Sequence, residues 1–203
     1  MAGESDKEGN IDGAVEICVE SDKEGSIDYG EIYFDIYKEL VRGDWDDATE
    51  FLNRHPQAIS AKITVKGKTA LHVAAEAGHV RMVEGLVNHM SAETLEIRDN
   101  EGFTALCRAT CRGNYRMAEC MLGKSGKLIS IQIERGYIPV VVALYNGHLK
   151  LARYLYSLTP QDLLMAEDGI IGATVVCEAI YNKALGKNQL FDNKSSSLVL
   201  FPT

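Results

Sequence analysis

The chain has 203 residues, of which 46% are hydrophobic and 25% are charged, and its net charge is −8. This composition is typical of a soluble globular protein, and no apolar run approaches the ~18 residues needed to span a bilayer. The acidic N-terminus has no basic segment followed by an apolar one, so we expect no signal peptide and a cytoplasmic location.

The net charge belongs to the N-terminal tail. Residues 1–31 contain ten acidic and two basic side chains, whereas the rest of the chain contains equal numbers of both. Without a basic excess in the folded part, nucleic acid is not an expected partner. The tail also holds two similar acidic segments, Glu4–Asp12 and Glu20–Asp28, which are too polar to build a core. We predict that residues 1–31 are a disordered tail.

A helical hairpin is predicted over residues 32–60. Apolar residues recur at helical spacing from Ile32 to Val41, and Gly43 interrupts the run. Asp44 or Asp46 could cap a second helix that ends near His55.

The central part of the chain repeats itself. A segment that begins Gly67-Lys-Thr-Ala-Leu-His returns 35 residues later from Gly102 and, after 34 more residues, from Gly136. A fourth, weaker copy begins at Gly172. Each copy has an Ala seven residues after the first Gly, at Ala74, Ala109, Ala143 and Ala179. A second Gly follows eleven residues after the first at Gly78, Gly113 and Gly147.

Each repeated residue type has a physical role in a helix–turn–helix unit. The first Gly suits a turn with positive φ, and the second suits a left-handed helix cap. Thr69 and Thr104 can cap the first helix of their units, and the small Ala lets neighbouring helices pack closely. One such hairpin cannot bury its apolar faces alone, so the units must stack. The predicted fold is all-α, a solenoid of such units.

The segment Thr69-Ala-Leu-His-Val-Ala-Ala and its spacing resemble the ankyrin repeat. The resemblance covers about residues 32–182 and implies repeats at about 66–98, 101–133 and 135–165, a degenerate unit at 169–184, and an irregular tail at 185–203. It also implies structural motif positions: Gly67, Thr69, Leu71, His72, Gly78, Gly102, Thr104, Gly113, Gly136 and Gly147. His72, like His79 and His148, is expected to bond between neighbouring turns.

Three segments are similar to plant ankyrin proteins with a C-terminal PGG transmembrane domain. These are Tyr37–Trp45, Thr64–His72 and Gly147–Leu149. The resemblance implies a scaffold or adaptor in stress or defence signalling, at a membrane for full-length members. We expect this chain to be a shortened member that does not insert into a membrane. A second reading is a regulatory fragment that competes with a full-length relative.

The sequence does not favour a phosphate-binding, metal-binding or catalytic site. Gly123-Lys-Ser follows a helix rather than a strand, the wrong context for a phosphate-binding loop. The segment from Glu20 to Glu31 approximates a calcium loop, which leaves a calcium-responsive module as a remote alternative. Five cysteines without paired spacing favour free thiols over a zinc site. No arrangement typical of catalysis is present, so we expect a non-enzymatic protein without cofactor or metal.

The resemblance places the binding residues on a concave face made of turn tips and inner helices. Two rows run across the repeats: Lys68, Phe103 and Tyr137 at the tips, and Glu76, Cys111 and Tyr145 on the helices. We predict that the three aromatic side chains are exposed and close together, as anchors for a protein partner. The full candidate set is Lys68, Glu76, Glu101, Phe103, Arg112, Arg135, Tyr137, Tyr145 and Asn146.

Overall fold

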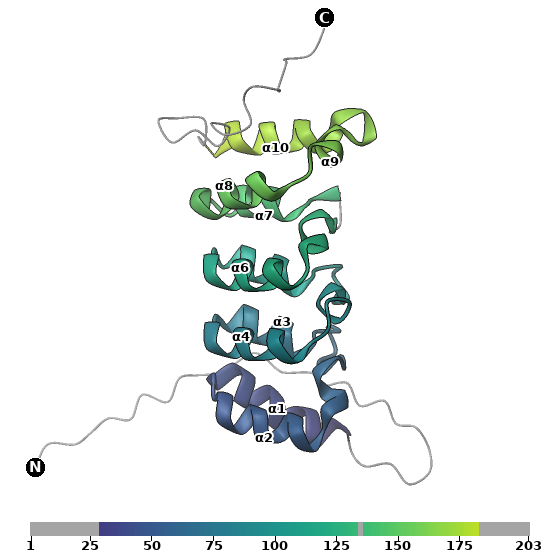
Figure 1. Ribbon diagram of the computed structural model, residues 1–203, viewed down its shortest axis with the longest axis vertical. Helices are drawn as coiled ribbons and strands as arrows, with labels where there is room; N and C mark the ends of the chain where they lie inside the picture. Colours follow the sequence, from purple (N-terminus) through teal and green to yellow (C-terminus); the bar gives the residue numbers. More distant parts are fainter. Residues whose placement is uncertain (1–28, 134–135, 183–203) are drawn as a thin grey trace, which may run out of the picture.

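The protein is a single column of stacked helical pairs (Figure 1). The computed structural model describes residues 29–133 and 136–182. The α-helices of this part are α1 (Tyr29–Arg42), α2 (Trp45–Arg54), α3 (Ala70–Ala77), α4 (Val80–His89), α5 (Ala105–Cys111), α6 (Tyr115–Lys124), α7 (Pro139–Tyr145), α8 (Leu149–Leu158), α9 (Gln161–Met165) and α10 (Ile170–Tyr181). Short 3-10 turns are η1 (Pro56–Ile59), η2 (Thr94–Glu96), η3 (Gly126–Ser130) and η5 (Glu167–Gly169). The fold is all-α, as the sequence predicts.

The helices form an inner and an outer column. The inner column is α1, α3, α5, α7 and α10, each packed on the next, and the outer column includes α2, α4 and α6. The inner helices α3, α5 and α7 have only seven or eight residues, too few to be stable alone in water. Their stability comes from packing, and the repeated Ala74, Ala109, Ala143 and Ala179 are all fully buried. Small side chains at these positions let the inner helices approach one another.

The predicted capping residues lie at the helix ends. Asp44 caps α2 by accepting from the Asp46 backbone N–H at 3.2 Å, and Thr104 accepts from Cys107 N–H at 3.4 Å. Thr69 forms a capping box with His72. Gly78 is the left-handed C-cap of α3, with φ of 91°. These local bonds satisfy backbone groups that the ends of short helices leave without partners.

The hairpin before each inner helix turns on the first glycine of the repeat. Gly67, Gly102 and Gly136 have φ of 68°, 80° and 72°. Adjacent tips are bonded together, since Asn100 donates its backbone N–H to the Lys66 carbonyl and its side-chain amide to the Val65 carbonyl. The Asn100 side chain occupies the space above Gly67, where a Cβ would lie 2.2 Å from Oδ1. A larger residue at Gly67 would therefore separate the two tips.

The turn of the fourth unit differs from the prediction. The repeat spacing places Gly172 at a turn, but Gly172 lies inside α10, where a Cβ would be 2.7 Å from the Leu164 carbonyl oxygen. The turn is made instead by Asp168 and Gly169, with φ of 54° and 80°. Contact with α9 favours helix over hairpin here, and α10 is longer than α3, α5 and α7 by about one turn.

Candidate functional site

The face made by the hairpin tips and inner helices holds the predicted binding residues, and we call it the inner face. The repeat spacing puts one residue of each row in each unit, so the rows run along the column. The side chains differ strongly in exposure. Tyr145 is 67% exposed, whereas Phe103 and Tyr137 are half-buried.

The inner-helix row is held by hydrogen bonds to its backbone. The backbone carbonyls of Glu76 and Cys111 in this row, and that of Val41 at the equivalent position of α1, each accept a side-chain donor from the following repeat. These pairs are His79 Nε2 with Val41 O at 2.7 Å, Arg112 Nε with Glu76 O, and His148 Nε2 with Cys111 O at 2.9 Å. Carbonyls at a helix C-terminus lack partners within the helix, and here the next repeat supplies them. The structural role expected of His79 and His148 is confirmed.

His72 links two repeats from a fully buried position. Its Nδ1 accepts from the Thr69 backbone N–H at 3.3 Å, and its Nε2 lies 3.0 Å from the Phe103 carbonyl oxygen. A neutral ring with its proton on Nε2 satisfies both bonds. Burial lowers the pKa of His72 from its ordinary value, which favours the neutral form. The expected structural role is confirmed, and Leu71 beside it is equally buried.

Asp99 organises the tip before α5. Its side chain is fully buried and accepts from the backbone N–H groups of Glu101 at 3.0 Å and Phe103 at 2.9 Å. Its other oxygen accepts from Arg108 Nε at 2.9 Å. Arg108 also donates to Glu101 Oε2 at 2.8 Å, and its guanidinium lies 4.3 Å from the centre of the Phe103 ring. The tip is therefore a rigid unit in which every charge has a partner.

This network corrects the prediction for Phe103. We expected an exposed anchor, but the ring is covered by Arg108 and half-buried. Tyr137 is likewise half-buried and packs against the hydrophobic core. Of the three aromatic residues, Tyr145 alone is largely exposed.

Some of the remaining candidate side chains form an ion pair with each other, and others are exposed to solvent. Lys68 and Glu76 form an ion pair with each other. Arg112 is exposed although its Nε is bonded, and Asn146 is exposed while its amide donates to the Val142 carbonyl at 2.8 Å. Arg135 lies outside the described residues. The open part of the inner face is therefore formed by Arg112, Tyr145 and Asn146, in adjacent repeats.

Sequence reasoning missed the polar network around Asp99. Its Asp-x-x-Gly spacing to Gly102 is a turn signal, since Asp accepts backbone N–H bonds within tight turns. No sequence pattern predicts the ion pair between Asp99 and Arg108, because this pair depends on how the tip folds back over α5.

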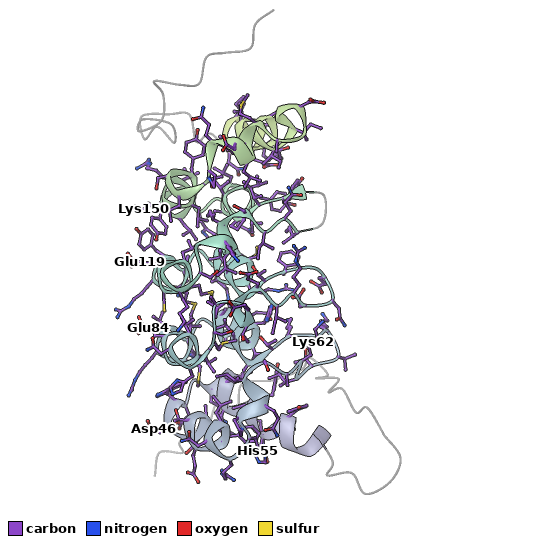
Figure 2. The ribbon with its side chains drawn as sticks, turned by 45° about the vertical axis from the view of Figure 1, so that its right-hand side comes forward. Asp46, His55, Lys62, Glu84, Glu119 and Lys150 are labelled. Carbon is purple, nitrogen blue, oxygen red and sulfur yellow. The ribbon has the colours of Figure 1, made fainter. Side chains whose placement is uncertain are left out.

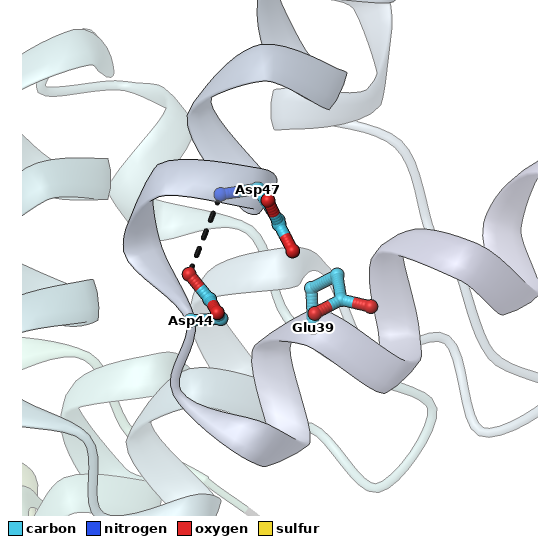
Figure 3. Close-up of side chains that lie close together, drawn as sticks. All are labelled: Glu39, Asp44 and Asp47. Carbon is cyan, nitrogen blue, oxygen red and sulfur yellow. Dashed lines mark hydrogen bonds between the residues drawn. The ribbon is translucent and has the colours of Figure 1, made fainter.

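Acidic side chains cluster beside the first turn of α2 (Figure 3). Oxygens of Glu39, Asp44 and Asp47 lie within 4.8 Å of one another. Asp44 is already the helix cap, and Glu39 pairs with Arg42 at 3.3 Å. These interactions account for the cluster as part of the α1–α2 junction. Residues 20–28 of the candidate calcium loop lie outside the described residues. Its last three residues, 29–31, which were also predicted to belong to the disordered tail, form the start of α1.

The cysteines in the described part of the chain are free thiols: Cys107, Cys111, Cys120 and Cys177. Burial raises the pKa of Cys107 to about 11 and also raises those of Cys111 and Cys120. A raised pKa keeps a thiol protonated and unreactive at neutral pH. Cys107 therefore behaves as a small core residue at the position that His72 occupies one repeat earlier.

Comparison with known proteins identifies the architecture. Residues 33–133 match the family described as Ankyrin repeats (3 copies). The fold is an ankyrin-repeat solenoid. Ankyrin repeats generally mediate protein–protein interaction, and ankyrin-repeat proteins are typically interaction scaffolds. No helix within residues 29–133 and 136–182 is long and apolar enough to cross a membrane.

Curated relatives are similar over about half of the chain. Calmodulin-binding transcription activator 2 of Mus musculus is 30% identical over 120 residues, which are 54% of this chain and 10% of that protein. Ankyrin repeat and KH domain-containing protein mask-1 of Caenorhabditis elegans is 31% identical over 104 residues, 49% of this chain and 4% of that protein. The chain thus matches only a small part of these relatives.

Proposed function

We propose that the ankyrin solenoid binds a protein partner through the inner face, with its anchor at Tyr145 and Arg112. The observation that carries this proposal is the exposure of Tyr145, 67% on an otherwise well-packed inner helix. Tyrosine and arginine are, with tryptophan, enriched among the residues that dominate interface energies. Tyrosine offers a large contact area at low entropic cost, and arginine offers several hydrogen-bond donors in a planar group.

The charge pattern of the inner face indicates the chemistry of the partner. Lys68 is paired with Glu76, and Arg108 is paired with both Asp99 and Glu101. Arg112 is bonded through Nε to a backbone carbonyl and forms no ion pair with a residue that the structure describes. We therefore propose a partner segment with a carboxylate for Arg112 and an apolar side chain for Tyr145.

Selection of peptides from a random library tests the site. Binders of the full chain are selected and their affinities are compared for the wild type, Tyr145→Ala and Arg112→Ala. Glu119→Ala on the outer helix α6 is the matched control (Figure 2). We expect selected peptides to contain acidic and apolar residues and to lose about 10-fold or more in affinity with either inner-face variant. Peptides that tolerate both variants, or failure to select any peptide, would count against this site.

We also propose, from the resemblance of residues 37–45, 64–72 and 147–149 to plant ankyrin proteins, a role in stress or defence signalling in the cytosol. The free cysteines fit a reducing compartment. Disruption of the gene should alter the response to salt or to a pathogen and leave unstressed growth unchanged. An unaltered response to both would contradict this role.

A further inference from the structure

The C-terminal helix of the described part ends the column with an apolar surface. α10 lies at the end of the stack opposite α1 and α2 (Figure 1), and it packs on α7 and α9. Its buried side is formed by Ile171, Val175 and Ala179. Among its twelve residues, Glu178 is the one with a charged side chain. A helix that is apolar on every side is normally covered on every side.

The exposed side of α10 carries a regular stripe. Ile170, Ala173, Cys177 and Ile180 follow one another at spacings of three, four and three residues, so they share one face of the helix. Ile170 is 60% exposed and Ile180 is 56% exposed. We call these four residues the α10 stripe. It differs from the outer helices, which present charged residues such as Glu84, Glu119 and Lys150 to solvent (Figure 2).

The α10 stripe is symmetric in size about Val175. A large Ile lies at each end, five residues from Val175, and a small residue lies two residues from it on each side. A rotation by 180° about an axis at Val175 therefore exchanges Ile170 with Ile180 and Ala173 with Cys177. In an antiparallel pair about a two-fold axis level with Val175, the small residues of the two copies therefore face each other at the centre, and an Ile of one copy faces an Ile of the other at each end.

We propose that the α10 stripe is a self-association surface, on which α10 of a second copy packs antiparallel about a two-fold axis at Val175. Ile170 of each copy then contacts Ile180 of the other. The small Ala173 and Cys177 meet at the centre, where they let the two helices approach closely.

The helix dipoles distinguish the antiparallel arrangement from a parallel one, because they are opposed in the antiparallel pair, which is the favourable arrangement. Glu178 lies about 120° around the helix from the centre of the α10 stripe, so its charge stays outside the contact in either arrangement.

Sedimentation velocity on the full chain, from about 10 µM to about 1 mM, tests the association. An interface of one helix per copy is small, so a concentration-dependent dimer is expected. Ile170→Glu should give a monomer at every concentration, because it places a charge in the apolar contact. Phe34→Glu, an equally drastic change at an exposed site on α1, should leave the dimer intact.

A charge exchange tests which residues meet. The double variant Ile170→Lys with Ile180→Glu should recover dimerisation, since each Lys then faces a Glu of the other copy. Circular dichroism melting checks that each variant remains folded, as expected for changes at exposed positions. A wild type that is monomeric throughout overturns the proposal. So does a chain that dimerises only after removal of residues 183–203, which would assign the stripe to that segment.

Disulfide trapping tests the orientation. With copper–phenanthroline as oxidant, Ala173→Cys should give a covalent dimer in which residue 173 is linked to Cys177 of the second copy, identified by mass spectrometry. Ala173→Cys combined with Cys177→Ser should give no such dimer, because residues 173 are then about 6 Å apart along the axis in addition to the separation of the helices. Efficient cross-linking of this second variant would show a parallel pair and overturn the antiparallel arrangement.

Discussion

Two joints between neighbouring units of the solenoid are held by different interactions. Between the α3–α4 and α5–α6 repeats, His72 bonds to the Phe103 carbonyl, Asn100 bonds to the preceding tip, and Arg112 bonds to the Glu76 carbonyl. Where α10 meets α7, the contact is dominated by Ile171, Val175 and Ala179. Apolar burial contributes stability without a fixed direction, whereas hydrogen bonds also fix the register of one repeat on the next.

These two joints differ in how easily they can accept a different neighbouring unit. Motif positions that hold Thr69 and His72 in the first repeat hold Ile138 and Val141 in the third, both fully buried. The third repeat therefore relies on shape and burial where the first relies on directional bonds. A joint of that kind can accept new neighbours more readily, which fits the exposed α10 stripe beyond it.

The largest expected effect comes from Gly113→Val, which breaks a bonded joint. Gly113 has φ of 70°, and a Cβ there would lie 2.5 Å from the ring of His148. The substitution both strains the backbone and expels the histidine from its bond to the Cys111 carbonyl, so we expect a loss of about 3 kcal/mol or more in stability. Chemical denaturation measures this loss.

Alanine substitutions at Gly78 and Gly113 separate backbone strain from the clash with His148. Gly78 has φ of 91°, but no described residue beyond its chain neighbours lies within 4 Å of the position that a Cβ would take. Gly78→Ala should therefore cost about 1–2 kcal/mol from backbone strain alone. Gly113→Ala should cost clearly more. Equal losses would show that His148 moves aside without cost.

Asp99→Ala should cost about 3 kcal/mol. It leaves the backbone N–H groups of Glu101 and Phe103 without their acceptor and removes one of the two carboxylates that pair with Arg108. Thermal denaturation checks the loss. Glu101→Ala, which removes the more exposed partner of Arg108, is the control and should cost less than about 1 kcal/mol.

The rate of amide hydrogen exchange should increase from the central repeats toward the C-terminal end of the column. We expect residues 66–122 to exchange slowest and residues 163–182 fastest within the part of the chain that the structure describes, with a difference of about 2 kcal/mol in opening free energy. Mass spectrometry resolves the two regions. The reverse order would refute the idea that the apolar joint is the weaker one.

The smallest effect concerns pH. The pKa of His72 is lowered in the folded protein, so its stabilising contribution is complete above the ordinary value of 6.5 and is lost as the pH falls through the lowered value. From pH 7 to pH 5, the wild type should therefore lose more stability than His72→Gln. Parallel slopes for the two proteins would mean that His72 is protonated without penalty.

The sequence predicts the fold well because its signals are local and repeated. The 34- and 35-residue spacings, the Gly78 cap and the Thr104 cap each depend on a few neighbouring residues, and the structure confirms them. The exposure of Phe103 and the turn of the fourth unit were predicted wrongly. Both depend on contacts formed only after folding, with Arg108 in one case and with α9 in the other.

The single tryptophan of the chain gives one end of the column its own optical signal. Trp45 begins α2 and packs against α4, where a Cβ on Gly85 would lie 2.3 Å from its ring. Its fluorescence therefore follows the docking of the N-terminal helical pair on the first repeat, whereas far-ultraviolet circular dichroism follows all the helices. If the column unfolds as one unit, the two transitions coincide. If it frays from α10, the dichroism changes first while the emission of Trp45 stays native.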